Sequence, residues 1–332
     1  GIKRWNYRQR ELPGVAPAVI RFLLPITLFG NITDLGYELP PLYENVEELP
    51  MTDVLAEQYH SLERDMLRQV LELVRNGDVG ALSALFWACR FRPASAFRPE
   101  SVDYVSKKGR GQIHWPLPQV ISGSTPWLPK ELKLADIVRA NMTQGRKTLV
   151  FVEQTGTRDI RDRLKQVIET LVPGGSLTLV QVPSVGVLSA SDMSPAKREA
   201  WIRSSAPRMD AMLVNPKLVE TGLDLVMFST LVFFETTVSL PVLWQSMRRV
   251  WRLGQDKDVD VIFLAYTGTV EETILQRMGQ KKKAAQLLYG KSAAGVLVEV
   301  DDDDLQRELI QAALQGKVLS VQGAKLTGIF TD

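Results

Sequence analysis

Residues 230–255 read TLVFFETTVSLPVLWQSMRRVWRLGQ, and this stretch decides the fold class that we expect. It opens on Thr230 and an unbroken apolar run, 231–234, and continues into a segment, 241–252, whose apolar spacing predicts a helix. Because successive strand residues point to opposite faces of a sheet, an unbroken apolar run indicates a strand that is covered on both faces. The stretch therefore predicts one strand and one helix of an α/β fold with a parallel sheet.

The same alternation of strands and helices continues on both sides of this stretch. We expect helices at 129–142, 157–171, 194–204, 241–252 and 270–289, and strands at 148–153, 177–181, 185–188, 211–214, 230–235 and 259–266. This order predicts an α/β domain with a parallel sheet and helices on both of its faces. Ligand sites of such sheets gather at the carboxyl ends of the strands, so we expect a site in the loops after residues 153, 188, 214 and 235.

Two arginines and a glutamine near the end of this stretch are separated by three and four positions. Arg249 and Arg252 lie three positions apart, and Gln245 lies four positions before Arg249, so on a helix all three share one face. Guanidinium groups match phosphate oxygens in a bidentate manner, and this donor cluster therefore suits a polyphosphate. An amphipathic helix with a solvated basic face has the same spacing, and spacing alone leaves both interpretations open.

The stretch resembles the arginine-finger motif of Swi/Snf-type superfamily 2 helicases, Q-x-x-x-R-x-x-R-x-G-Q, and it matches every fixed position. Segments 147–168, 214–225 and 268–283 resemble further motifs of this family in the family's order. Residues 39–59 resemble the passage that leaves the first lobe, with Leu42 in place of the usual lysine. The sequence departs from the family at Glu235, where an aspartate is usual, and at 238–240, where Val-Ser-Leu replaces Trp-Asn-Pro.

The resemblance implies a RecA-like second lobe of an ATP-dependent DNA translocase or helicase, of bacterial or phage type. The first lobe of such motors carries the phosphate loop and the carboxylates that hold Mg²⁺. Neither a G-x-x-x-x-G-K-[ST] motif nor an acidic box after an apolar strand occurs in these 332 residues. We therefore expect ATP and Mg²⁺ to be held mainly by a first lobe that is missing from this chain, so that the full-length protein hydrolyses ATP and the isolated chain does not. The alternative is a non-catalytic scaffold for protein or DNA, derived from a helicase lobe.

The resemblance also implies the roles of individual residues. Arg249 and Arg252 are expected to be the catalytic arginine fingers, and Gln245 the amide that faces phosphate or water. The ATP-binding candidates are Gly222, Asp224 and Gln255, and the candidates for contacts with DNA phosphates are Ser189, Ser191 and Lys217. A local loop cap is the other interpretation of Asp224. Gly254 is expected to turn the chain out of the helix, and Gln255 to steady its return.

Composition excludes several other classes of protein. A net charge of +2 argues against a polycationic tail, and 45% apolar with 23% charged residues is typical of a globular protein. The single cysteine, Cys89, excludes an internal disulfide, and with only two histidines beside it we expect no metal site. No apolar run is long enough to span a bilayer. We therefore expect no membrane contact and a cytoplasmic protein, associated with the nucleoid if the source is bacterial.

The chain is expected to divide into four parts. Residues 1–50 form a linker that leaves the absent first lobe, 51–128 a helical protrusion with an irregular insertion, 129–292 the RecA-like lobe, and 293–332 an acidic linker with a helical tail. Apolar spacing predicts helices over 52–75 and 79–91, whereas prolines and glycines predict an irregular course over 92–128.

The resemblance, together with this organisation, implies three partners. They are double-stranded DNA contacted through its phosphates, the first RecA-like lobe of the same polypeptide, and a protein bound by the 92–128 insertion or by the C-terminal tail. Within the insertion, the basic loop 107–111 is compatible with phosphate contact or with simple solvation.

Overall fold

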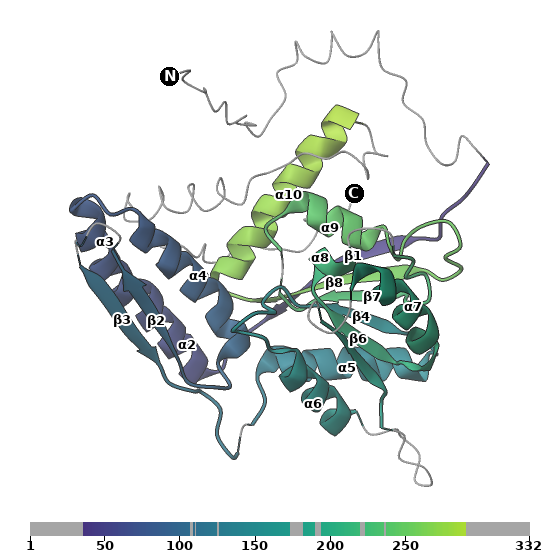
Figure 1. The fold of residues 1–332 in the computed structure, drawn as a ribbon, viewed down its shortest axis with the longest axis horizontal. Helices are drawn as coiled ribbons and strands as arrows, with labels where there is room; N and C mark the ends of the chain where they lie inside the picture. The colour runs from purple at the N-terminus through teal and green to yellow at the C-terminus, as the bar shows by residue number, and fades with distance from the viewer. Residues whose placement is uncertain are drawn as a thin grey trace.

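The computed structural model describes residues 36–106, 109, 111–124, 126–172, 182–189, 194–219, 223–235 and 237–289. Within them, six parallel strands form one sheet in the order β1-β8-β7-β4-β6-β5 (Figure 1). The strands are β1 (Leu42–Leu49), β4 (Thr148–Phe151), β5 (Val185–Leu188), β6 (Ala211–Val214), β7 (Thr230–Phe233) and β8 (Val259–Tyr266). The predicted parallel α/β sheet is confirmed. Because all six strands run the same way, the sheet has an amino edge, where they begin, and a carboxyl edge, where they end.

Helices cover both faces of this sheet (Figure 1). Helices α5 (Pro129–Thr143) and α6 (Arg161–Leu171) pack on one face, and α7 (Pro195–Ser205), α9 (Leu240–Met247) and α10 (Val270–Tyr289) on the other. In β4, Leu149 and Phe151 face the core under α9 and α10, whereas Val150 faces the core under α5 and α6. Both faces are buried, which explains why the strands carry apolar residues at nearly every position.

A second unit, made of helices and a hairpin, packs beside the sheet (Figure 1). Helix α2 (Asp53–Ser61), a π-helical turn (Leu62–Met66) and α3 (Leu67–Arg75) form one continuous run, and α4 (Gly80–Ser95) follows. Thr52 caps this run, because its Oγ1 accepts a hydrogen bond from the N–H of Leu55 at 3.4 Å. Gly77 ends the run with a φ of +82°. Both predicted helices are confirmed, and the second continues to Ser95.

The irregular course predicted for 92–128 is wrong where that segment forms a hairpin. Strands β2 (Glu100–Val105) and β3 (Gln112–Leu117) pair in antiparallel register, and the N–H of Ser106 donates to the carbonyl of Gly111 at 3.0 Å to close the loop. Gly111 has a φ of +139°, which a glycine adopts without strain. Of the glycines and prolines that suggested irregularity, Gly109 and Gly111 lie in the connecting loop, whereas Pro93 lies inside α4 and Pro116 in β3. Val102 and Ile113 of the two strands are buried in the core.

Strand β1 joins the sheet at its edge. It pairs with β8 along its whole length, from Leu42 opposite Val259 to Leu49 opposite Tyr266. The sequence placed these residues in a linker and predicted no strand for them. An edge strand has one neighbour and little burial of its own, so LYENVEEL carries polar residues that gave no strand signal.

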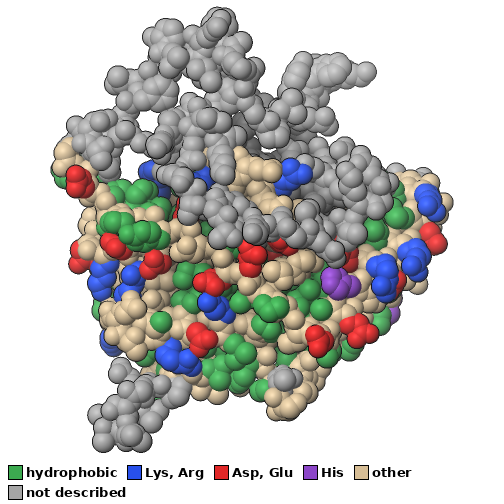
Figure 2. All heavy atoms as spheres, turned by 180° about the vertical axis from the view of Figure 1, so that it is seen from behind, with side chains coloured by type: hydrophobic (Ala, Val, Ile, Leu, Met, Phe, Trp, Pro, Cys, Tyr) green, Lys and Arg blue, Asp and Glu red, His purple; other side chains and the backbone are tan. Residues whose placement is uncertain are grey.

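Two predicted segments, the strand at 177–181 and the acidic linker with its tail at 293–332, lie outside the described residues. Among the helices that are described, none combines the length and the apolar character needed to cross a membrane. On the face seen in Figure 2, acidic and basic side chains are interspersed with apolar ones.

Candidate functional site

The candidate arginines lie in a turn and not on one face of a helix. Helix α9 ends at Met247, and residues 248–255 follow as a series of turns that we call the arginine turn. The N–H of Arg249 donates to the carbonyl of Ser246 at 3.3 Å, and that of Val250 to Met247 at 3.1 Å. This three-residue spacing tightens the last turn of a helix. The predicted helix 241–252 is therefore wrong at its carboxyl end.

Gln255 holds the arginine turn in place. Its side-chain nitrogen lies 3.0 Å from the carbonyl oxygen of Val226, 3.0 Å from that of Phe228 and 3.2 Å from that of Val250. Its side-chain oxygen accepts a hydrogen bond from the N–H of Lys257 at 3.1 Å. The predicted role of Gln255 in steadying the chain is confirmed, and so is the turn at Gly254, whose φ is +95°. Contact between Gln255 and ATP stays a prediction.

The loop before β7 packs against the arginine turn. The N–H of Leu225 donates to the carbonyl of Arg249 at 3.0 Å. Asp224 is exposed beside this contact, and its Oδ1 accepts a long hydrogen bond of 3.4 Å from the N–H of Val226, which is the local cap weighed for it. Gly222 lies outside the described residues. Two predicted nucleotide segments that are 25 positions apart, at Asp224 and Arg249, are thus brought together.

The three catalytic candidates differ in exposure. The side chain of Arg252 is exposed, whereas Arg249 and Gln245 are half-buried. All three precede β8, and the loop that contacts them precedes β7, so this group lies toward the amino edge of the sheet. The sequence predicted a site at the carboxyl ends of the strands. The arginine turn lies outside those loops, because α9 carries the chain back across the sheet before the arginines are reached.

The candidates for DNA phosphate contact lie at the carboxyl edge. Ser189 follows β5, and its hydroxyl accepts a hydrogen bond from the guanidinium of Arg161 at 2.8 Å. Lys217 lies in the short helix α8 (Pro216–Val219) after β6, and its side chain is exposed. Ser191 lies outside the described residues. Neighbouring strands therefore bring Ser189 and Lys217 to the same edge, as predicted from their positions after strands.

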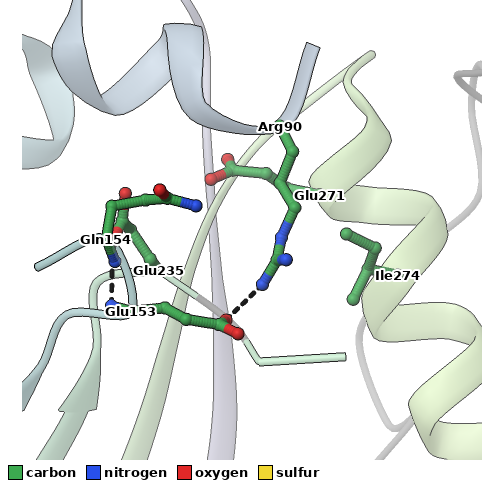
Figure 3. Close-up of a pocket in the computed structure, with 6 residues that line it drawn as sticks. All are labelled: Arg90, Glu153, Gln154, Glu235, Glu271 and Ile274. Carbon is green, nitrogen blue, oxygen red and sulfur yellow. Dashed lines mark hydrogen bonds and ion pairs between the residues drawn. The ribbon is translucent and has the colours of Figure 1, made fainter. Parts of the chain in front are cut away.

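A set of polar and charged side chains that the sequence did not predict gathers at the same carboxyl edge. We call it the carboxyl-edge cluster, and it consists of Arg90, Lys130, Glu153, Asn215, Glu235 and Glu271. The Arg90 guanidinium, on α4, faces the Glu153 carboxylate at the end of β4 and forms an ion pair with it (Figure 3). The Asn215 side chain donates to the carbonyl of Glu153 at 2.8 Å. The cluster therefore ties the helical unit to the sheet.

Glu235 is buried within this cluster at the end of β7. Its Oε2 accepts hydrogen bonds from the N–H groups of Glu153 at 2.9 Å and Gln154 at 2.8 Å. Burial raises the pKa of Glu235 to about 7, and the nearby charge of Glu153 acts in the same direction. The hydrogen bond from Gln154 lowers the pKa and opposes burial only in part. Near neutral pH this carboxyl group is therefore close to half protonated.

Lys130 and Glu271 form a second buried pair beside Glu235. The ammonium of Lys130 lies 2.5 Å from Glu271 Oε1 and 3.1 Å from the carbonyl oxygen of Phe234, and the Lys130 side chain is fully buried. The other oxygen of Glu271 accepts from the N–H of Tyr266 at 3.0 Å. Sequence reasoning missed this pair because its members are 141 positions apart. Glu271 lies in the first turn of α10, where the macrodipole favours a carboxylate in any case, so it gave no separate signal.

Comparison with known proteins bears on this arrangement. Residues 129–254 match the family described as helicase conserved C-terminal domain. This match covers 129–254, which is part of the segment predicted to be the RecA-like lobe. The chromatin-remodeling ATPase INO80 of Mus musculus is 32% identical over 178 residues, which are 50% of this chain and 10% of that protein. The DNA repair and recombination protein RDH54 of Saccharomyces cerevisiae is 33% identical over 117 residues, 34% of this chain and 13% of that protein. The chain thus spans about a tenth of the length of these curated relatives.

Two solved structures share the fold of this chain. The C-terminal part of the Fun30 ATPase domain aligns with a TM-score of 0.58 at 14% identity, covering 84% of this chain and 100% of that one. The Sulfolobus solfataricus SWI2/SNF2 ATPase core in complex with dsDNA aligns with a TM-score of 0.51 at 14% identity, covering 86% and 51%. The RecA-like fold is therefore confirmed. The two curated relatives are eukaryotic, so a bacterial or phage origin stays a prediction.

Proposed function

We propose that this chain is the second motor lobe of an ATP-dependent DNA translocase, in which the arginine turn completes an ATP site held by a first lobe. The observation that carries this proposal is that hydrogen bonds from Gln255 and Leu225 hold the arginine turn in position while the side chain of Arg252 is exposed. A guanidinium that is fixed through its backbone and faces outward is suited to a ligand held by another surface. In this proposal the first lobe holds ATP and Mg²⁺.

The chemistry requires positive charge at the moment of phosphoryl transfer. Negative charge on the transferred group is stabilised by a positioned arginine, which contributes about 10³- to 10⁵-fold to turnover in enzymes of this kind. Arg252 and Arg249 are proposed to supply this charge when the lobes close, and Gln245 to orient phosphate or water. Asp224, beside the turn, is proposed to contact the nucleotide.

DNA is proposed to bind along the carboxyl edge through its phosphates. The hydroxyl of Ser189, the ammonium of Lys217 and the predicted contact of Ser191 suit phosphate oxygens and provide no bidentate reading of a base edge. The arginine turn and the candidate DNA contacts then occupy opposite edges of one sheet. Lobe closure over ATP would therefore move the DNA contacts with it.

The proposal is tested in the full-length protein that contains both lobes. Arg252→Ala is expected to lower DNA-stimulated ATP turnover by about 10³-fold or more, while the DNA dissociation constant changes by less than threefold, because the arginine acts on the transition state. Arg203→Ala, on the exposed side of α7, is the matched control and should leave both values unchanged. Equal losses of DNA affinity and turnover would assign Arg252 to DNA, and unchanged turnover would favour the non-catalytic scaffold.

The isolated chain provides a second test, which asks whether ATP and Mg²⁺ are held by the first lobe. It is expected to show no DNA-stimulated ATPase above background, since ATP and Mg²⁺ are proposed to be held elsewhere. Robust turnover by the purified chain that survives Arg249→Ala would overturn the proposal.

A further inference from the structure

A groove opens at the carboxyl edge between helix α4 and the ends of β4 and β6. It has a volume of about 340 Å³, within the range of small-molecule sites. Its lining residues are Trp87 and Phe91 from α4, Gln154 and Arg158 from the segment after β4, and Asn215 and Lys217 from the segment after β6, with Glu153 at its base. Aromatic rings from one unit thus face cationic and amide side chains from the other.

Several of these side chains are already held in place by neighbours. The guanidinium carbon of Arg158 lies 3.9 Å from the ring centroid of Phe91, and that of Arg90 lies 4.9 Å from the centroid of Trp87. Arg90 also pairs with Glu153, so the one carboxylate that lines the groove is neutralised. The groove consequently has fixed walls and an excess of positive charge from Arg158 and Lys217.

Three polar groups of the groove make no hydrogen bond within the described part of the chain. They are the ammonium of Lys217, the carboxamide of Gln154 and the indole N–H of Trp87. Trp87 is also 37% exposed, although it lies on a helix whose other aromatic residues, Phe86 and Phe91, are buried. A buried or paired position is the usual one for so large an apolar side chain, and an exposed tryptophan beside free donors points to a ligand.

The ligand that matches these groups has a flat ring, a negative charge and acceptors at the ring's edge. A nucleotide has all three: its base stacks on an aromatic side chain, its phosphate meets a cation, and its edge accepts hydrogen bonds from an amide. In an intact duplex both faces of a base are covered by its neighbours, so only an unstacked base is available for such contact.

We propose that this groove binds one unstacked nucleotide of the DNA. Trp87 stacks on the base, Gln154 contacts the edge of the base, and Lys217 with Arg158 contacts the adjacent phosphate. This inference rests on the proposed function in taking DNA as the substrate. It adds that the DNA engaged by this lobe carries an unpaired base, as at a bulge, a mismatch or a junction with single strands.

The test compares three duplexes of one length with the full-length protein. The first is fully paired, the second has a single bulged thymidine, and the third has a bulged abasic residue with the same backbone and no base. Stacking of one base on an aromatic side chain corresponds to about 5- to 150-fold in affinity, so the bulged thymidine should bind more tightly than the abasic bulge by such a factor. Fluorescence anisotropy measures all three dissociation constants.

Variants separate the base contact from the phosphate contact. Trp87→Ala should remove the preference for the thymidine bulge over the abasic bulge and keep the affinity for paired duplex within twofold. Trp87→Phe should retain part of the preference for the thymidine bulge. Lys217→Ala should weaken all three duplexes equally. Tyr43→Ala, which removes an exposed aromatic ring from β1 at the far edge of the sheet, is the matched control. Thermal unfolding of each variant verifies that it is folded.

The outcomes distinguish this inference from the proposed function. Equal affinity of the wild-type protein for the thymidine and abasic bulges, with normal binding of paired DNA, overturns the groove proposal and leaves the motor proposal standing. A preference that persists in both Trp87 variants also overturns it. Absence of binding to any of the three duplexes overturns both.

Discussion

The two edges of the sheet build their polar groups in different ways. At the amino edge, the arginine turn consists of consecutive residues, 248–255, and its important side chain, Arg252, is exposed. At the carboxyl edge, the cluster is assembled from α4, α5, β4, β6, β7 and α10, and four of its charged members, Arg90, Lys130, Glu235 and Glu271, are buried. The first edge is a local motif that is held by backbone contacts. The second exists only when six elements are packed together.

This difference predicts different responses to substitution. An exposed guanidinium contributes little to stability, so its loss should affect a reaction and leave folding intact. A buried charge that loses its partner destabilises the folded state, because it keeps the desolvation cost without the compensating attraction. The predictions below use this contrast, from the largest expected effect to the smallest.

Breaking the buried pair should destabilise the protein most. Lys130→Met keeps the volume of the side chain and leaves Glu271 without its partner, so we expect the free energy of unfolding to fall by about 3–5 kcal/mol. Urea unfolding followed by circular dichroism measures it. Arg203→Met, which breaks an exposed pair with Glu199 on α7, should cost less than about 1 kcal/mol. A cost below 1 kcal/mol for Lys130→Met would erase the contrast between the edges, whereas recovery in a double variant that adds Glu271→Gln would sharpen it.

The buried carboxyl group of Glu235 should make stability depend on pH. Its pKa of about 7 in the folded protein lies above the ordinary value of 4.5, so the folded state binds the proton more tightly than the unfolded state. The contribution of this group is therefore fully present below pH 4.5 and is lost as the pH rises toward 7. Since each pKa unit corresponds to about 1.4 kcal/mol, the loss amounts to at most about 3 kcal/mol.

The measurement compares the wild-type protein with Glu235→Gln in urea at pH 5 and at pH 8. The wild-type protein should lose up to about 3 kcal/mol more between these two values than the variant does. Glu199→Gln, at an exposed position on α7, should behave as the wild type. An identical pH dependence of the wild type and Glu235→Gln would refute the assignment.

Gln255 tests whether the exposed edge depends on a buried support. Gln255→Ala leaves the carbonyl groups of Val226, Phe228 and Val250 without this donor, at a cost of about 1–3 kcal/mol. In the full-length protein, kcat for ATP should also fall, because the arginine turn loses its position, while DNA affinity stays unchanged. Gln280→Ala, exposed on α10, is the control. A loss of stability with unchanged kcat would mean that the turn keeps its position without Gln255.

The salt dependence of DNA binding should show the smallest effect. For the isolated chain, a plot of log affinity for DNA against log salt concentration is expected to be linear with a slope of about −2 to −4, at roughly −0.9 for each phosphate neutralised. Lys217→Ala should reduce the magnitude of this slope by about 0.9, whereas Arg252→Ala at the opposite edge should leave it unchanged. A slope that changes in Arg252→Ala and not in Lys217→Ala would mean that DNA phosphates contact the amino edge of the sheet and not the carboxyl edge.

Elements with two covered faces were predicted well from the sequence. Strands β4, β6 and β7 consist mostly of apolar residues, and helices α5 and α10 begin and end within two residues of their predicted limits. Strand β1 was missed because an edge strand carries polar residues and gains its hydrogen bonds only from β8, more than 200 positions away. The hairpin was missed because the glycines of its loop and the prolines in and beside its strands outweighed the apolar alternation of its two short strands.

The sequence by itself determined the parallel α/β sheet, because burial on both faces imposes an apolar pattern on every central strand. It also determined the spacing of Gln245, Arg249 and Arg252, because that spacing is a property of the chain. Only the tertiary structure decided that α9 ends at Met247, since the contacts that hold the following turn come from Val226 and Phe228. Only the tertiary structure decided the carboxyl-edge cluster and the groove of Trp87 and Lys217, because pairing between residues that are far apart in sequence leaves no local pattern.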